Sequence, residues 1–371
     1  MNAYVIYNAT QNDSNLIYWG HFEAPDPFLA IKLGEHKVAF ISELEYGRCK
    51  ATSRFDEVLL FTEIREQAQQ KYNKLNVWAA LFCFLKDRYS IDGFIIPDNF
   101  PAKIYAEIKS FVEVNFDRSF FETQRALKTA DEIEEIKKAC SLTAETIDYA
   151  RDILRQSDVR NGELYWEQQP LTSNRLRAMM EVYCLLHGGY ADSTIIACRQ
   201  EASDPHCLGS KVLLANQFIV VDFFPRLQKS HYYGDMTRTF IKGNVSQEQA
   251  KMYACVYQCQ QALIGKIHPG VKTSELMQFA LDFFDKAGYG LRKSESGYEG
   301  FIHSVGHGLG LDIHEYPSLG HRPTILEAGM VVTVEPGLYF KDRGGVRIED
   351  DVLVTSEGAR VLSHCDYELE V

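Results

Sequence analysis

Short apolar runs alternate with longer helical stretches along the first third of the chain. Residues 38–41, 57–61 and 93–96 form compact apolar runs next to polar or turn-forming residues, whereas the apolar stretch at residues 77–85 fits a helix. This pattern predicts an α/β domain, and no catalytic motif lies within it.

A long amphipathic helix is predicted at the start of the second part of the chain. Thr129 is a suitable N-cap, and Glu132, three residues later, completes a capping box. The length of 371 residues also favours two domains over one. We therefore predict one domain of residues 1–122 and another of residues 123–371.

The second domain has two halves with the same order of elements. Helices are predicted over residues 133–156 and 174–187 in the first half, and over residues 247–266 and 274–287 in the second. In each half, strands that contain acidic residues follow the helices. This order predicts an α+β domain with an internal pseudo-two-fold repeat.

Four acidic residues lie inside the apolar strand-like runs of this domain: Asp222, Asp235, Glu335 and Glu349. Burial of an unpaired carboxylate is unfavourable by several kcal/mol, so such residues need positive partners. Any one of them could instead belong to an ion pair or a helix cap. The four together favour a centre that holds two divalent cations.

A short polar connection joins the first two acidic residues. If this segment is an antiparallel hairpin, Asp222 faces Asp235 across a turn centred on Gln228 and Lys229. Residues that face each other in this way have side chains about 5 Å apart.

The second pair is expected to meet in the same way, with Glu335 facing Glu349 across a turn centred on Asp342. His307 is the best candidate for a nitrogen ligand, because its flanking glycines allow close approach of the backbone. Carboxylates with one imidazole and no thiolate favour manganese, cobalt, iron or zinc over a structural zinc site. Two such ions about 3.5 to 4 Å apart can share a bridging hydroxide that acts as nucleophile.

Composition argues against several classes of partner. With 46% hydrophobic and 24% charged residues, the chain is typical of soluble globular proteins. The net charge of -12 and the lack of a basic stripe argue against nucleic acid. No apolar run is long enough to cross a bilayer, and the first residues do not resemble a signal peptide. The nine scattered cysteines form no C-x-x-C pair and indicate free thiols in a reducing cytoplasm.

The acidic residues stand within a specific series of motifs. Asp222 is followed by residues 235–239 (Asp-Met-Thr-Arg-Thr), 303–315, 334–337 (Val-Glu-Pro-Gly) and 345–350 (Gly-Val-Arg-Ile-Glu-Asp). In this order they resemble the M24 metallopeptidases, which have the pita-bread fold, and especially the branch of the Xaa-Pro aminopeptidases and Xaa-Pro dipeptidases (prolidases).

The resemblance continues more weakly through the rest of the chain. Residues 12–19 are similar to the start of the family's creatinase-type N-terminal domain, and residues 127–133 to the start of its catalytic domain. It implies a homodimer in which the N-terminal domain helps to close the partner's site.

The resemblance also implies a role for each metal ligand. Asp222 and Asp235 would hold one ion, His307 and Glu335 would complete the other, and Asp235 and Glu349 would bridge the two. Glu335 would also transfer protons to and from the nucleophile, as suits a carboxylate whose pKa a nearby metal tunes.

Five further residues would surround the substrate. His206 would face it, and His314 would stabilise the tetrahedral intermediate, so both join Glu335 as catalytic residues. His303 and Arg347 would line the prolyl pocket. Arg322 lies where some prolidases place the arginine that binds the free carboxylate of a short substrate, although a solvated loop arginine fits equally well.

The sequence departs from the family pattern at two places. Phe224 stands where the family has glycine, and residues 225–231 carry an insertion between the two aspartates. The extra residues could extend the tip of the hairpin with its register kept, or they could form a bulge. Residues 158–172 are also an inserted loop, which we place on the surface rather than over the active site.

We therefore predict a metallo-exopeptidase that hydrolyses the bond between an N-terminal residue and proline, as an aminopeptidase or a dipeptidase, with two divalent metal ions, manganese favoured. The alternative is a catalytically silent or creatinase-like homologue that serves as a binding protein or as a non-peptide C–N hydrolase. All five ligand positions keep ligating side chains, which favours the enzyme. A methionine aminopeptidase is a weaker alternative, because of the large N-terminal domain and the motif at residues 345–350.

Overall fold

The computed structural model describes residues 1–294 and 297–371. The chain forms two compact units, Met1–Gln124 and Arg125–Val371, called here the N-terminal unit and the C-terminal unit. The sequence-based boundary after residue 122 lies two residues before this division.

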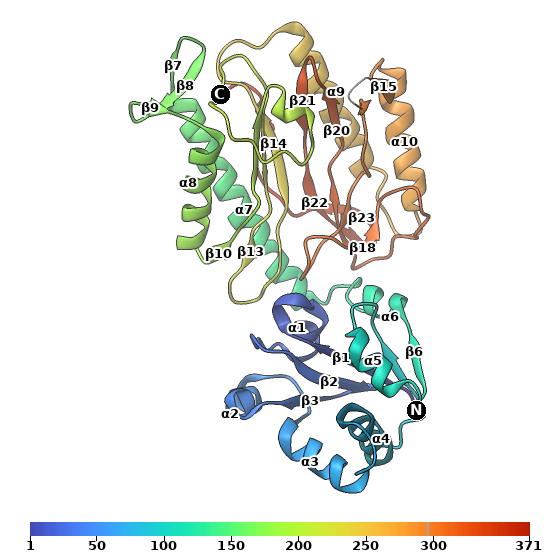
Figure 1. The fold of residues 1–371 in the computed structure, drawn as a ribbon. Helices are drawn as coiled ribbons and strands as arrows, with labels where there is room; N and C mark the ends of the chain where they lie inside the picture. The colour runs from blue at the N-terminus through green and yellow to red at the C-terminus, as the bar shows by residue number, and fades with distance from the viewer. Residues whose placement is uncertain (295–296) are drawn as a thin grey trace. The chain divides into compact units, whose positions relative to one another are not determined.

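A six-stranded mixed sheet forms the centre of the N-terminal unit (Figure 1). Across the sheet the strands are β4 (Glu57–Leu60), β3 (His36–Ile41), β2 (Phe28–Leu33), β1 (Ala3–Asn8), β5 (Phe94–Ile96) and β6 (Val114–Phe116). Strands β1 to β3 pair antiparallel, whereas β4, β5 and β6 each join in parallel. The three strands predicted in this unit are confirmed.

Helices cover both faces of this sheet. They are α1 (Ser14–Gly20), α2 (Glu43–Thr52), α3 (Phe61–Lys71), α4 (Val77–Tyr89), α5 (Ala102–Ile108) and α6 (Arg118–Thr123). Neighbouring strand residues point to opposite faces, so Ile31 packs with α3, α4 and α5, whereas Ala30 packs with α1, α2 and α6. The predicted α/β architecture is therefore correct.

The C-terminal unit consists of two halves, each with two helices and a sheet. The first half contains α7 (Ala130–Gln156), α8 (Ser173–Leu186) and a sheet in the order β11 (Ile195–Cys198), β12 (Ile219–Phe223), β14 (Met236–Phe240). The second contains α9 (Gln247–Ile264), α10 (Thr273–Lys286) and a sheet in the order β18 (Glu315–Ser318), β17 (His307–Gly308), β19 (Val331–Val334), β22 (Asp350–Thr355), β23 (Gly358–Val361). A separate hairpin of β20 (Gly337–Phe340) and β21 (Gly344–Arg347) lies between β19 and β22 in the chain.

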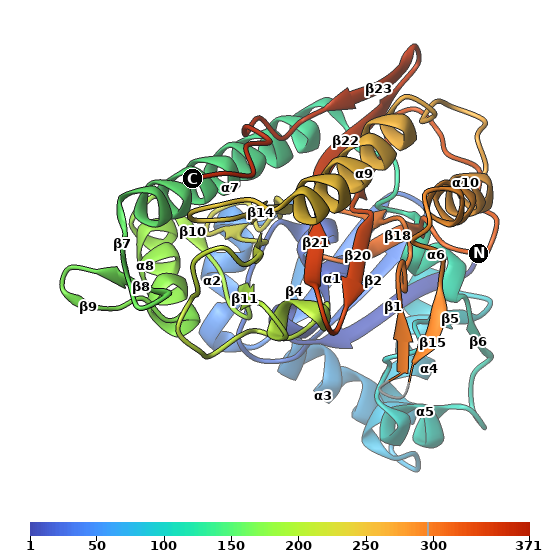
Figure 2. The ribbon, with the colours of Figure 1, turned by 90° about the horizontal axis from the view of Figure 1, so that it is seen from above.

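The long helices pack against the strands that carry the acidic residues. Helix α7 contacts β12 and β14, and α9 contacts β19, β20 and β21. Figure 2 shows, from above, α7 near β14 and α9 near β21 and β20. Both helices begin with a complete capping box, in α7 the predicted one of Thr129 and Glu132, and in α9 one of Ser246 and Gln249. The predicted α+β repeat of helices followed by strands is confirmed.

The inserted loop at residues 158–172 forms a small sheet of its own. Its strands are β7 (Asp158–Arg160), β8 (Glu163–Trp166) and β9 (Gln169–Pro170), which lie beside α8 at the edge of the C-terminal unit (Figure 1). Leu164 and Leu171 are buried in the core of the first half and anchor it there. None of the helices in the described parts of the chain is long and apolar enough to span a membrane.

Candidate metal centre

The first acidic pair does not have the predicted register. In the β12–β14 ladder Asp222 lies opposite Thr237, and Phe223 lies opposite Met236. The prediction that Asp222 directly faces Asp235 is therefore wrong by two residues.

The inserted connection explains this shift. The antiparallel pairing continues past the strands to a bridge between Arg226 and Tyr233, and His231 has a left-handed backbone (φ 65°) in the turn. The same register thus runs to the tip, without a bulge between these pairs. Because a strand alternates with a period of two, a two-residue shift keeps Asp222 and Asp235 on the same face as diagonal neighbours.

The second acidic pair has the predicted register. Gly337 pairs with Arg347 in the β20–β21 hairpin, and Val334 pairs with Asp350 between β19 and β22. Both pairings place Glu335 directly opposite Glu349. The turn falls at residues 341–343, so its predicted centre at Asp342 is confirmed.

Ligating atoms from both halves converge. One ligand atom each from Asp235, His307 and Glu349 lies within 4.8 Å of the others. Glu335 Oε1 lies 3.4 Å from His307 Nε2. Asp222 is close enough that its charge raises the pKa values of Asp235 and Glu349. The five predicted ligands therefore form one cluster.

The carboxylates of this cluster are buried together. Burial raises the pKa of Asp235 and Glu349 well above the usual range, and neighbouring carboxylates raise both further. Burial also raises the pKa of Glu335 to about 8, although Arg347 opposes this shift. Added positive charge beside Asp235, Glu335 and Glu349 would therefore favour their ionised forms.

The geometry fits divalent cations. Asp222 Oδ1 and Asp235 Oδ1 are buried and have no hydrogen-bond partner among the described residues. Burial, and then the neighbouring His314, lower the pKa of His307 to about 3, so its imidazole is neutral and can ligate. Oxygen ligands with one imidazole suit hard or borderline divalent metals.

Hydrogen bonds involve two of the predicted ligands. Thr237 Oγ1 donates to Glu349 Oε2 at 2.6 Å, and the Asp235 backbone N–H donates to Asp351 Oδ2 at 2.8 Å. Cys140 Sγ, from α7, donates to the same Asp351 oxygen at 3.1 Å. Sequence patterns gave no role to Asp351 or Cys140 and placed Thr237 only within a motif, because their roles depend on contacts between distant segments.

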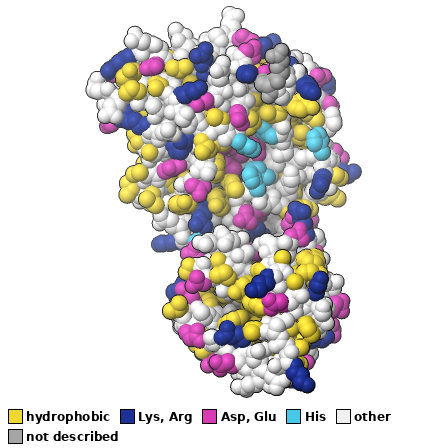
Figure 3. Space-filling view, in the orientation of Figure 1, with side chains coloured by type: hydrophobic (Ala, Val, Ile, Leu, Met, Phe, Trp, Pro, Cys, Tyr) yellow, Lys and Arg dark blue, Asp and Glu magenta, His cyan; other side chains and the backbone are white. Residues whose placement is uncertain are grey.

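Three predicted histidines surround the cluster. The His314 ring meets the His307 ring edge to face, with centroids 4.3 Å apart. The His303 ring nitrogen Nδ1 lies 4.0 Å from Glu335 Oε2. His206 is exposed, and its charge would lower the pKa values of both His303 and His314. Figure 3 shows histidine side chains next to acidic ones on one face of the C-terminal unit.

Arg347 is part of the cluster. Its Nη2 donates to Asp222 Oδ2 at 2.5 Å, and its Nη1 donates to the Tyr339 hydroxyl at 2.9 Å. The Tyr339 hydroxyl also lies 3.0 Å from His303 Nε2, so this tyrosine, which sequence patterns did not reveal, joins Arg347 to His303. A contact of Arg347 with substrate stays a prediction.

Arg322 lies on the exposed segment between β18 and β19. Its backbone carbonyl accepts a hydrogen bond from Thr273 Oγ1 at 3.0 Å. Among the described hydrogen bonds and ion pairs, none joins its guanidinium to the cluster. Its role as a carboxylate-binding residue also stays a prediction.

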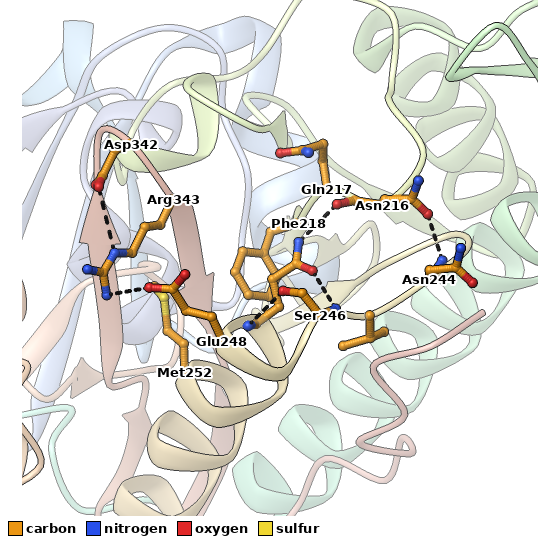
Figure 4. A pocket seen from close by; sticks show the side chains of 11 residues that line it. Asn216, Gln217, Phe218, Asn244, Ser246, Glu248, Met252, Asp342 and Arg343 are labelled. Atoms are coloured by element: carbon orange, nitrogen blue, oxygen red, sulfur yellow. Dashed lines mark hydrogen bonds and ion pairs between the residues drawn. The ribbon is translucent and has the colours of Figure 1, made fainter.

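A separate cavity of about 470 Å³ lies at the start of α9 (Figure 4). Its polar lining is used within the protein: Asn216 accepts hydrogen bonds from the Asn244 backbone and the Gln249 side chain, and Arg343 pairs with Glu248 at 3.1 Å. None of the predicted site residues lines this cavity. The cavity lies between the β20–β21 turn and the start of α9.

Comparisons with known proteins identify the family. The sequence model of metallopeptidase family M24 matches residues 134–356. The Xaa-Pro dipeptidase of Pyrococcus furiosus is 30% identical over 345 residues, which cover 91% of this chain and 87% of that protein. The chain belongs to metallopeptidase family M24.

Solved structures show the same fold over both units of this M24 protein. The prolidase from Pyrococcus horikoshii OT3 is similar with a TM-score of 0.80 and 26% identity, over 100% of this chain and 95% of that one. The Xaa-Pro dipeptidase from Bacillus anthracis is similar with a TM-score of 0.82 and 25% identity, over 100% and 95%. The C-terminal unit therefore has the pita-bread fold of the Xaa-Pro peptidase branch, and the chain is a metallo-exopeptidase.

Proposed function

We propose that this M24 protein hydrolyses the bond between an N-terminal residue and proline with two divalent metal ions held by Asp222, Asp235, His307, Glu335 and Glu349. One observation carries the proposal: these side chains from both halves converge, with two buried carboxylate oxygens that lack a partner among the described residues. When bound, such ions lower the pKa of a water molecule and polarise the scissile carbonyl. Manganese is the favoured metal, as expected for hard oxygen ligands with one imidazole.

The surrounding residues supply proton transfer and orientation. Glu335, whose Oε1 lies 3.4 Å from His307 Nε2, would take a proton from the nucleophile and return it to the leaving nitrogen once bound cations keep its carboxylate ionised. Burial, and then His206, lower the pKa of His314, so it is a neutral imidazole that can donate an N–H to the developing oxyanion. His206, whose charge acts on both His303 and His314, would orient the substrate.

The prolyl ring would occupy an apolar and aromatic environment. Tyr339 and Phe301 lie against His303, at ring-centroid distances of 5.4 and 5.2 Å. Arg347 would hold these aromatic side chains in place through its hydrogen bonds to Tyr339 and Asp222. Arg322 would bind the free carboxylate of a dipeptide.

The names of the similar proteins favour a dipeptidase, so we propose that Xaa-Pro dipeptides are cleaved faster than longer peptides. The protein would be a cytoplasmic homodimer.

The test compares Xaa-Pro with Xaa-Pro-Xaa on protein loaded with manganese, together with a metal count by mass spectrometry. We expect about two equivalents of metal and faster cleavage of the dipeptide. Cleavage of Xaa-Pro-Xaa alone would make the protein an aminopeptidase, and Arg322→Ala would then leave KM unchanged. Cleavage of neither substrate, with fewer than two metal ions, would instead favour a silent homologue.

A further inference from the structure

The loop that ends at His314 has little support from the sheet around it. It connects β17, which contains His307, to β18, which starts at Glu315. Strand β17 has only two residues, and the register of the β17–β18 pairing shifts between His307 and Gly308. Strand pairing alone therefore does not determine where His314 lies relative to His307.

The Glu315 side chain instead closes this loop from inside. Glu315 Oε1 accepts hydrogen bonds from the backbone N–H groups of Leu311 at 2.9 Å and Asp312 at 3.0 Å. Gly310 packs directly on the carboxylate, since a Cβ atom there would lie 2.5 Å from Glu315 Oε2. One carboxylate thus fixes three successive residues of the loop.

Two cations from the start of the C-terminal unit hold that carboxylate. Lys128 Nζ lies 2.8 Å from Glu315 Oε2, and both side chains are only 2% exposed. Arg125 Nη1 lies 2.7 Å from Glu315 Oε1, and Arg125 Nη2 reaches Asp312 Oδ2 at 2.6 Å. The Lys128 ammonium also donates to the Arg125 carbonyl at 2.5 Å. Buried charges of this kind keep a fixed geometry, because a displaced partner would leave an uncompensated charge.

We propose that Glu315 is a positioning residue: its carboxylate, held by Lys128 and Arg125, sets the His314 imidazole beside His307. This role rests on the proposed peptidase function, in which His314 stabilises the oxyanion. The Glu315 side chain is only 2% exposed, so it would act through the loop of residues 310–314 and not by contact with the substrate.

Two substitutions and their combination test this role. In Glu315→Gln the amide oxygen can still accept from Leu311 and Asp312, but the amide NH2 group then points at the Lys128 ammonium. Because both groups are donors, the side chain must rotate and the loop must move. In the double variant Lys128→Met with Glu315→Gln the ammonium is gone, so the amide can keep the native orientation.

We expect Glu315→Gln to lower kcat by about 10- to 100-fold, the effect of moving a catalytic group by about 1 Å, with KM and metal content near those of the wild type. The double variant should recover most of this loss. The matched control is Glu248→Gln, which removes a carboxylate from the half-exposed Arg343 pair of the same unit and should leave kcat unchanged. Wild-type kcat in Glu315→Gln, or no recovery in the double variant, would overturn the proposal, since a purely structural ion pair alters stability and not the rate of the folded enzyme.

A readout independent of activity separates this proposal from the proposed function. Hydrogen exchange should be faster at the Leu311 and Asp312 amides in Glu315→Gln than in the wild type or the double variant. Crystal structures should show the 4.3 Å contact between the His307 and His314 rings lost only in the single variant. An unchanged loop would refute the positioning role even for an active enzyme. A displaced loop in a protein that cleaves no Xaa-Pro peptide would support positioning and refute the proposed function.

Discussion

Burial makes the charge of the metal-binding carboxylates depend on what is bound beside them. In the metal-free protein the raised pKa of Glu335, about 8 against an ordinary 4.5, means that the folded state keeps a proton that the unfolded state releases. Stability due to this group is therefore present at low pH and is lost as pH rises from 4.5 to about 8. His303 and His307 act in the opposite direction, because burial lowers the pKa of each to about 3, and their effect is complete above pH 6.5.

Between pH 6.5 and 8 the change of stability with pH therefore comes mainly from the buried carboxyl groups. We expect the free energy of unfolding of the metal-free protein to fall by at least about 2 kcal/mol across this range, because each carboxyl group that stays protonated only in the folded state contributes about 1.4 kcal/mol per pH unit. Urea denaturation in the presence of a chelator measures this change. The fall should be smaller in Glu335→Gln, where this carboxyl cannot ionise, and a fall as large as that of the wild type would contradict the assignment.

At the scale of elements, the two hairpins show when the pairing of strand residues can be predicted from the sequence. The Glu335–Glu349 hairpin has a three-residue turn at residues 341–343, so the midpoint of the chain segment gave the register directly. Between Asp222 and Asp235 the midpoint lies one residue before the real turn, which displaces the pairing by two residues. Both acids still reach the cluster, because side chains along a strand alternate between its two faces. A shift by an even number of residues therefore leaves each side chain on the same face.

Residues outside the apolar and acidic pattern could not be predicted in the same way. Tyr339 and Asp351 read as ordinary strand residues, and only the packed structure brings them to His303 and to the Asp235 backbone. Glu315 likewise follows a motif histidine without any signal that Lys128 lies against it. Ligand types and strand positions follow from sequence, whereas the contacts that orient the ligands follow from tertiary packing.

The contact between the β20–β21 hairpin and the segment before His206 gives a prediction at this scale. A Cβ atom on Gly345 would lie 1.9 Å from the Ala202 carbonyl oxygen. Gly345→Ala should therefore push the segment at residues 201–206 away from the hairpin, destabilise the protein by about 1 to 3 kcal/mol and raise KM. Denaturation and steady-state kinetics would measure both effects.

Gly47→Ala is the matched control. Gly47 lies within α2, and a Cβ atom there would meet nothing within 4 Å. We expect a gain in stability of up to about 1 kcal/mol from higher helix propensity, with unchanged kinetics. Equal effects of the two alanines would show that the Ala202 contact is unimportant.

At the scale of the whole molecule, the proposed metal centre would join the two halves of the C-terminal unit. Asp222 and Asp235 come from the first half, and the other ligands from the second. The buried Arg238 makes a parallel connection: it pairs with Asp350 at 2.8 Å and donates to the Glu349 carbonyl at 2.7 Å. The Arg238 contacts thus hold together the same two halves that the proposed metal ligands would join.

Metal loading should therefore stabilise the C-terminal unit selectively. The N-terminal unit has its own two cores and contributes none of the proposed ligands. At a metal concentration about 100 times the Kd, binding adds about 2.7 kcal/mol of stability. For a unit of this size that raises the melting temperature by about 5 to 10 °C.

Calorimetry of the full chain with and without chelator should show the transition of the C-terminal unit moving while that of the N-terminal unit stays in place. Substitution of His307 by alanine should abolish most of the shift, and a shift that persists in this variant would refute the ligand assignment.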